Sequence, residues 1–154
     1  MAQWVLDEAN TPTEPFLFLA ATDEEDVVGN LALRMQPVTL PATEWSGGVD
    51  KPLLDASGEP VTETFVQTFA VDETHRRRGI GRALQEAAVA WTRDVGCAQM
   101  RSWSSMDKPK NYALKLSMGF AMHPAVHDAA GGFQVSGVYF VKRVDYGTGS
   151  DPVP

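Results

Sequence analysis

The clearest pattern of hydrophobic and polar positions lies in the middle of the chain. Residues 62–71 are rich in β-branched and aromatic side chains, which predicts a β-strand. Its two predicted faces carry Val66, Thr68 and Ala70 on one side and Phe65, Gln67, Phe69 and Val71 on the other. From Ile80 to Val95, apolar residues recur every three or four positions, which predicts an amphipathic helix that stops at Gly96. The pattern therefore predicts a strand, a short loop rich in arginine and glycine, and a helix in direct succession.

Shorter apolar runs on either side predict a largely antiparallel sheet. Two runs before the central strand form an expected hairpin. A run directly after the central helix supplies the second, parallel strand of a βαβ crossover. The predicted elements outside the central stretch are strands over residues 16–21, 27–35, 97–103 and 133–144, a short strand over 120–123, and a helix over 108–118. The fold class is therefore α+β, a mixed, largely antiparallel sheet with a central crossover and flanking helices.

Length and composition predict one domain. The 154 residues, of which 44% are hydrophobic and 21% charged, suffice for one ordinary core. We expect a short N-terminal segment over residues 1–15, a single domain over 16–144 and a flexible C-terminal tail over 145–154. Residues 36–60 contain four prolines and little periodicity, which predicts a long loop.

Charge and residue usage narrow the classes of partner. A net charge of −7 disfavours nucleic acid, whose phosphates require a basic face. Cys97 is the sole cysteine, so an intrachain disulfide is impossible, and no cluster of Cys and His indicates a metal site. The N-terminus is acidic where a signal peptide is positive, and no apolar run approaches the ~18 residues of a membrane-spanning helix. We therefore expect a cytoplasmic protein that binds neither nucleic acid nor membrane.

The loop before the central helix predicts an anion site. The first N–H groups of a helix lack intrahelical acceptors, and the helix dipole makes that end positive. Gly79 and Gly81 remove Cβ atoms that would hold a ligand off the backbone, and the arginines over residues 76–78 add charge. The loop lacks the third glycine of a dinucleotide-binding fingerprint and the Lys-Ser/Thr pair of a P-loop. A phosphate or pyrophosphate is the expected ligand; the alternative is a basic turn that binds nothing.

Two motifs resemble a known family. Arg76-x-x-Gly79-x-Gly81, followed by Arg-Ala-Leu, resembles the acyl-CoA pyrophosphate loop of the GNAT N-acetyltransferase superfamily. Residues 111–120, NYALKLSMGF, are similar to the family's later helix, which ends in Gly-Phe. The resemblance spans about residues 27–144. It implies the GNAT fold, acetyl-CoA as co-substrate without a metal, and direct transfer of the acetyl group to a primary amine of a small molecule or a protein.

The resemblance also assigns candidate CoA-binding positions. In the family, the strand before the loop and the strand after its helix splay apart, and the pantetheine arm of CoA lies in the gap. Main-chain atoms of Phe69, Ala70 and Val71 would hold this arm, Asn111 would touch it, and a backbone N–H near Val71 would stabilise the oxyanion. The loop would surround the pyrophosphate with Arg76, Arg77, Arg78, Gly79, Ile80, Gly81, Arg82 and Ala83.

Two further side chains are candidates for proton transfer. Glu63 is the candidate general base, because it lies on the strand face of Phe69 if no bulge intervenes; the alternative is an exposed carboxylate at the strand end. Many family members have a Tyr on the later helix, four residues before the Gly of Gly-Phe, where this chain has Lys115. Tyr112, close to one turn earlier, is the candidate acid for the thiolate. Lys115 would either stabilise the thiolate or simply be solvated.

The acceptor side departs from the family pattern. Family members normally have a strand and two helices before the hairpin, and the roughly 15 residues before Phe16 contain no such helices. The alternatives are an open acceptor site, a homodimer partner that closes it, or replacement by the loop over residues 36–60. Trp45, Trp103 and Tyr139 are candidate acceptor contacts. Two other functions fit the same residues, an acyl-CoA-binding sensor without turnover and a structural domain without a ligand.

Overall fold

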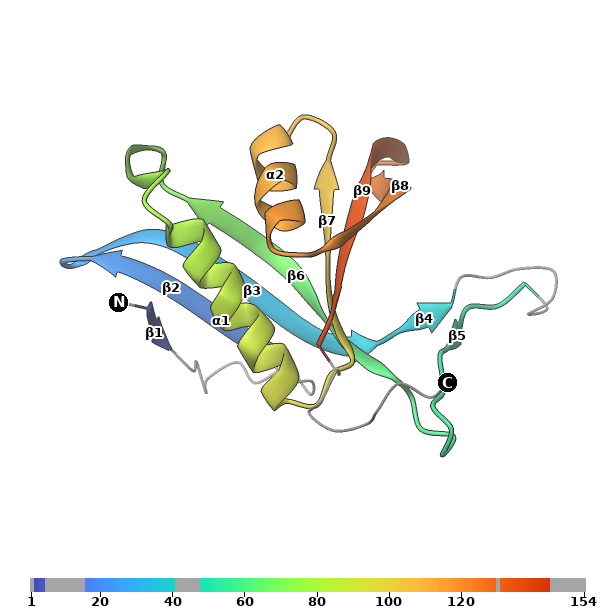
Figure 1. Cartoon of the computed structure of the whole chain (residues 1–154). Helices are drawn as coiled ribbons and strands as arrows, with labels where there is room; N and C mark the ends of the chain where they lie inside the picture. The colour runs from blue at the N-terminus through green and yellow to red at the C-terminus, as the bar shows by residue number, and fades with distance from the viewer. Residues whose placement is uncertain (1, 5–15, 41–47, 130, 145–154) are drawn as a thin grey trace.

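One seven-stranded sheet forms the body of the protein, with the strand order β1-β2-β3-β6-β7-β9-β8 (Figure 1). The structure is a computed structural model that describes residues 2–4, 16–40, 48–129 and 131–144. The strands of the sheet are β1 (Ala2–Trp4), β2 (Phe16–Asp23), β3 (Asp26–Pro37), β6 (Thr62–Val71), β7 (Gln99–Ser105), β8 (Ala121–Ala129) and β9 (Phe133–Arg143). Neighbouring strands run antiparallel except β6 and β7, which are parallel. The predicted α+β sheet with one parallel crossover is confirmed.

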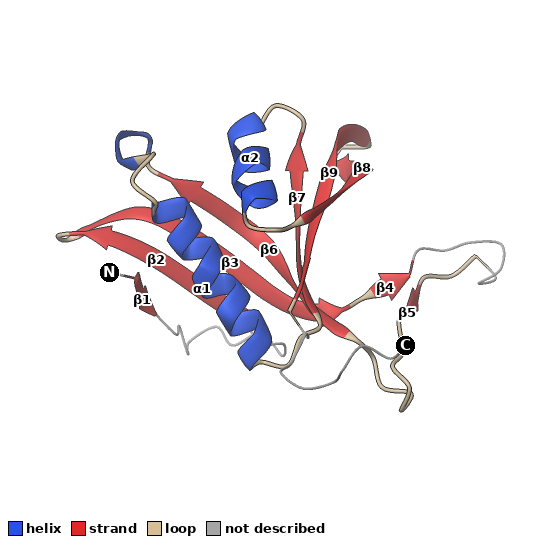
Figure 2. Ribbon diagram, viewed as in Figure 1, coloured by secondary structure: helices blue, strands red, loops and turns tan. Residues whose placement is uncertain are grey.

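In the described part of the chain, two helices and a short 3-10 turn accompany the sheet. The turn η3 (Glu73–His75) and the helix α1 (Ile80–Asp94) connect β6 to β7, and α2 (Pro109–Ser117) connects β7 to β8. Figure 2 shows α1 lying across the sheet formed by β2, β3 and β6. Leu84 and Ala88 of α1 are buried with Leu19 and Leu31 of the sheet, and all four are at most 1% exposed. This apolar face fixes the helix, and with it the loop at the helix start, against the strands.

The parallel strands β6 and β7 pair over only three positions, from Glu63 opposite Gln99 to Phe65 opposite Arg101. Beyond Phe65 the two strands diverge, and Figure 1 shows α2 on the β7 side of the opening. The predicted splay is therefore present. Among the described residues, no strand pairs with this edge of β6 over residues 66–71, which line a cavity.

A β-bulge in β6 reverses the face assignment made from the sequence. Leu33 of β3 pairs with Val66, whereas the preceding Ala32 pairs with Thr68, so Gln67 is an extra residue in the ladder. Thr64 on one side of the bulge bonds to α1 through the Thr92 hydroxyl at 2.6 Å. Phe69, five residues after Thr64, also reaches α1, where its Cζ lies 3.2 Å from the position of a Cβ on Gly81. Strict alternation cannot produce this arrangement, because an odd separation places residues on opposite faces.

Other differences from the predictions follow from context. β1 shows that part of the segment over residues 1–15 joins the sheet, and a two-stranded ladder, β4 (Thr39–Leu40) with β5 (Lys51–Pro52), lies within the expected loop. β8 extends through Pro124 to Ala129, beyond the predicted short strand over residues 120–123. Proline is tolerated there because β8 is the last strand in the sheet order and presents a free edge. Among the described residues, no helix is long and apolar enough to cross a bilayer.

Candidate functional site

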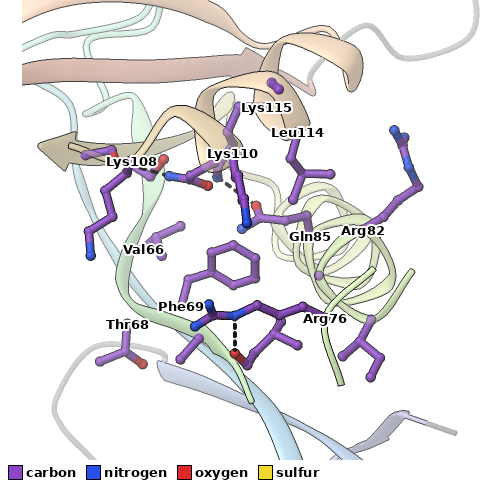
Figure 3. Close-up of a pocket in the computed structure, with 18 of the residues that line it drawn as sticks. Val66, Thr68, Phe69, Arg76, Arg82, Gln85, Lys108, Lys110, Leu114 and Lys115 are labelled. Carbon is purple, nitrogen blue, oxygen red and sulfur yellow. Dashed lines mark hydrogen bonds between the residues drawn. The ribbon is translucent and has the colours of Figure 1, made fainter. Parts of the chain in front are cut away.

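A cavity of about 880 Å³ opens where β6 and β7 separate. The free edge of β6 forms one wall, and β7 and α2 form the opposite wall. The loop over residues 76–79 and the first residues of α1 close one end. Figure 3 shows the Phe69 side chain from β6 between Arg76 and the side chain of Gln85. The cavity therefore combines an unpaired strand edge with the start of a helix, two places where backbone groups are available to a ligand.

The loop at the start of α1 leaves the first helical N–H groups open. Gly79 is the N-cap in the left-handed region, with φ 81°, and no side chain caps the helix. Arg77 also has a positive φ of 67°. A Cβ at Gly81 would lie 3.2 Å from Cζ of Phe69, so a side chain at this position would enter the cavity end. In the turn before the loop, the hydroxyl and the N–H of Thr74 both donate hydrogen bonds to the carboxylate of Asp72. These bonds lower the pKa of Asp72 to about 2, so its carboxylate stays charged.

Every ionisable side chain among the described residues that line the cavity is basic. They are His75, Arg76, Arg77, Arg82, Lys108, Lys110 and Lys115. No Asp or Glu of the described residues lines it, although the chain contains 20 acidic residues and carries a net charge of −7. This concentration of positive charge within an acidic protein favours an anionic ligand.

The arginines of the loop divide between two hollows. Arg76 stays at the cavity, where its Nε donates to the carbonyl of Val71 at 3.2 Å, and Arg82 donates to the Ser117 hydroxyl at 2.7 Å. Arg78 and Ala83 line a smaller hollow of about 280 Å³ instead. Arg78 lies 3.7 Å from the carboxylate of Asp23 there. The other predicted CoA-binding residues line the large cavity: Phe69, Ala70, Val71, Arg76, Arg77, Gly79, Ile80, Gly81, Arg82 and Asn111.

Three buried polar atoms on the cavity wall have no hydrogen-bond partner among the described residues. They are Nε2 of Gln85, Oγ of Ser102 and Oδ1 of Asn111. Burying such groups without partners costs about 1–3 kcal/mol each. A ligand with amide donors and acceptors would satisfy all three, since the set offers both an N–H donor and an oxygen acceptor. Gln85 and Ser102 were not expected from the sequence, where each reads as an ordinary residue of its helix or strand.

Lys115 is buried on the cavity wall, with 1% of its side chain exposed. Its Nζ donates to Oε1 of Gln85 at 2.7 Å and lies 4.4 Å from the ring centre of Phe120. Burial lowers the pKa of Lys115 from 10.5 to about 7. The alternative that this lysine is simply solvated is wrong, because α2 packs its side chain inward.

Glu63 lies outside the cavity, in a buried ion pair. Its carboxylate is 0% exposed and accepts hydrogen bonds from Nε2 of Gln36 at 2.9 Å and Nε2 of Gln99 at 2.8 Å. Arg101 adds a bidentate contact, with Nη2 at 2.5 Å and Nε at 2.9 Å from Oε1. The expectation of an exposed strand-end carboxylate is wrong, and the bulge at Gln67 separates Glu63 from the face of Phe69. This geometry joins β3, β6 and β7 and disfavours a role as base.

Tyr112 also lies outside the residues that line the cavity. Its hydroxyl donates to the carbonyl of Ser105 at 3.0 Å, and its ring packs edge-on against Phe140 with the ring centres 5.2 Å apart. Tyr112 and Lys115 do not share the cavity face, contrary to the expectation from their spacing. The hydroxyl holds the end of β7, so this geometry disfavours Tyr112 as the acid.

The aromatic candidates for acceptor contacts have different positions. Trp103 lines the cavity and packs on Gly137, where a Cβ would lie 2.7 Å from the indole ring. Tyr139 packs on the guanidinium of Arg101, 4.8 Å from its ring centre. Trp45 lies outside the described residues, and no described residue of the loop over 36–60 lines the cavity. Within the described part of the chain, no group of three or more His, Cys, Asp or Glu side chains is placed to hold a metal ion.

Comparisons with known proteins agree with this architecture. The model of the Acetyltransferase (GNAT) family matches residues 2–120. An aminoglycoside N(6')-acetyltransferase type 1 of Stenotrophomonas maltophilia is 29% identical over 115 residues, which are 75% of this chain and 65% of that protein. The chain thus spans less than two thirds of that relative's length.

Solved structures show the same fold. NAA60 of Arabidopsis thaliana in complex with acetyl-CoA has a TM-score of 0.66 and 21% identity, covering 84% of this chain and 76% of that one. The putative acetyltransferase yncA of Salmonella typhimurium with acetyl-CoA has a TM-score of 0.58 and 14% identity, covering 90% and 70%. The match of the family model to residues 2–120, more than half of the chain, establishes that the chain belongs to the GNAT acetyltransferase family.

Proposed function

We propose that this protein transfers the acetyl group of acetyl-CoA to a primary amine by direct attack in a ternary complex. The observation that carries the proposal is the wholly basic ionisable lining of a cavity that joins an open helix start to an unpaired strand edge. A pyrophosphate suits the first of these features and an amide-containing arm suits the second. The family relatives with acetyl-CoA bound support the same co-substrate.

The cavity suggests how CoA lies in it. The pyrophosphate would meet the N–H groups from Gly79 to Arg82, with Arg76 and Arg77 beside it. The pantetheine arm would run along the free edge of β6 from Val71 toward Val66, because that edge offers backbone donors and acceptors. This direction carries the thioester from the helix start toward the bulge at Gln67.

The chemistry then requires an amine to attack the thioester carbon. Because the thioester lies toward Gln67, a backbone N–H of β6 near this bulge would stabilise the oxyanion in place of the N–H near Val71 expected from the resemblance. The leaving sulfur must accept a proton or meet a positive charge. The described cavity wall supplies cations for the second requirement but no carboxylate for removing the amine proton. We therefore assign that proton to solvent water, which the open side of the cavity admits.

The same lack of a carboxylate among the described lining residues favours a second candidate function. An acyl-CoA-binding sensor or interaction module needs the cationic cavity and no base. Both candidates bind CoA, and only turnover separates them.

Acceptors are best tested as a panel of amines. The relative from Stenotrophomonas maltophilia is an aminoglycoside acetyltransferase, and a net charge of −7 attracts cationic acceptors. We propose a small cationic amine and would measure thiol release from acetyl-CoA with an aminoglycoside, a polyamine and a peptide with a free N-terminus. Release that depends on acceptor and is lost in Gly81→Glu supports the enzyme. CoA binding without release from any of the three supports the sensor.

Two properties expected from the sequence belong to the same proposal. A cytoplasmic location fits the use of acetyl-CoA, and a homodimer would supply a wall for the acceptor. Fractionation of cells and light scattering of the purified protein test these two statements separately.

A further inference from the structure

We propose that Lys115 is the catalytic acid that delivers a proton to the sulfur of CoA as the acetyl group leaves. The inference rests on the proposed function, since it assigns a role within acetyl transfer. Lys115 projects from α2 into the cavity wall opposite the free edge of β6 (Figure 3). It combines burial, a position on the cavity and a dissociable proton.

The surroundings of Lys115 leave its amine available for chemistry. Among the described residues, no carboxylate forms an ion pair with Nζ, which donates a hydrogen bond to the neutral amide oxygen of Gln85. The charged side chains that line the cavity with it or contact the same Phe120 ring are cations, among them Arg82 on α1, Lys110 on α2, Lys142 on β9 and Arg76 on the loop. Glu86 on α1 is paired with Arg82 at 3.9 Å, and α2 contains no Asp or Glu. A buried lysine without an ionic partner is unusual and marks functional sites.

The other ionisable groups of the cavity are less suited to this step. Arginine does not give up its proton in proteins. Lys108 and Lys110 are exposed on the outer part of the wall. His75 lies at the phosphate end, with Nε2 3.3 Å from the carboxylate of Asp23. Lys115 is therefore the one buried proton donor among the described lining residues.

The proton balance of the step is simple. The tetrahedral intermediate collapses, the C–S bond breaks and its electron pair passes to sulfur, which takes a proton from the Lys115 ammonium. The neutral amine then recovers a proton from water, while the proton of the attacking amine goes to water. An ammonium with a pKa of about 7 gives its proton favourably to a thiolate whose ordinary pKa is about 8.5, whereas an ordinary lysine would not. The burial that lowers the pKa thus makes this donor effective near neutral pH.

Titration of the CoA thiol in the protein complex tests the inference without an acceptor. The thiolate is followed by its ultraviolet absorbance, with the desulfo-CoA complex as the blank for tyrosine ionisation. We expect Lys115→Met to bind CoA as the wild type does but to raise the pKa of the bound thiol by about one unit or more, because methionine neither carries a charge nor donates a hydrogen bond to the thiolate. Lys51→Met is the control: Lys51 is exposed in β5, away from the cavity, and its loss should leave the thiol unchanged.

The arginine variant separates proton donation from simple charge. Lys115→Arg keeps a positive charge and should keep the thiol pKa low, yet slow thiol release by roughly 100-fold with an active acceptor, because the guanidinium holds its proton. A thiol pKa that is the same in Lys115→Met and wild type would overturn the inference while leaving CoA binding intact. A wild type that does not bind CoA would instead refute the proposed function itself.

Discussion

Lys115→Met should remove a dependence of stability on pH that the buried amine imposes. In the unfolded chain this lysine keeps its proton up to a pKa of about 10.5, whereas in the folded protein it loses the proton above about 7. Between these values the unfolded state binds more protons, so the free energy of unfolding rises with pH. Below pH 7 the lysine is protonated in both states and the penalty for burying its charge is fully present.

The magnitude follows from the size of this window. Each pH unit above the folded pKa is worth about 1.36 kcal/mol until the unfolded pKa is reached. From pH 6 to pH 8.5 the wild type should therefore gain about 2 kcal/mol from this residue alone. Methionine has a similar volume and no charge, so the variant keeps the packing on Phe120 and loses the gain.

Urea denaturation at pH 6, 7, 7.75 and 8.5 measures the effect as a difference between variant and wild type. Taking the difference cancels the contributions of the other titrating groups to the pH dependence. Cys97 is one of them, because burial raises the pKa of its thiol. Lys110→Met, which removes an exposed lysine of the same helix, is the matched control and should follow the wild-type curve. A difference between Lys115→Met and wild type that stays constant across this range would refute the buried, uncompensated amine.

Three further substitutions test other parts of the structure. Arg101→Met leaves the buried Glu63 carboxylate without its cation and should lower the free energy of unfolding by about 3 kcal/mol. A Glu63→Gln/Arg101→Met double variant should recover part of this lost stability. An equal loss of stability in the single and the double variant contradicts the ion pair. Tyr112→Phe should cost about 1 kcal/mol through its lost hydrogen bond while the rate of thiol release stays unchanged, whereas a slower release would restore Tyr112 as the acid. Gly137→Ala should destabilise by about 1–3 kcal/mol in thermal unfolding, because its Cβ meets the Ser104 carbonyl, and a neutral effect would contradict this close approach.

The sequence predicted the parts of the site that depend on local chain geometry. The helical period from Ile80, the glycines at its start and the strand before it are local signals, and the structure joins them as expected. The family resemblance added the splay of β6 and β7, which pair over only three positions.

The remaining features depend on tertiary packing, which the sequence alone did not show. One inserted residue, Gln67, exchanged the faces of β6 and moved Glu63 away from Phe69, because the side-chain period of a strand is two. The sequence left open whether Lys115 is a solvated helix lysine, because only the packing of α2 buries its side chain. The predicted short strand stopped at residue 123, before Pro124, yet a strand at the sheet edge accommodates this proline.

Calorimetric titration of acetyl-CoA tests the central claim, that the start of α1 and the β6 edge form a CoA site. We predict binding to the wild type and at least a 100-fold weaker affinity in Gly81→Glu, about 2.7 kcal/mol, since the new carboxylate enters the cavity end and repels the pyrophosphate. Ala90→Glu adds the same charge on an exposed position of α1 away from the cavity and should bind as the wild type does. Arg77→Gly should weaken binding about 10-fold, because it removes a cation from the loop. Glycine suits the positive φ of this position, so this variant still tests the site if Gly81→Glu fails to fold. Failure of the wild type to bind acetyl-CoA, or equal binding by all four proteins, would contradict the account.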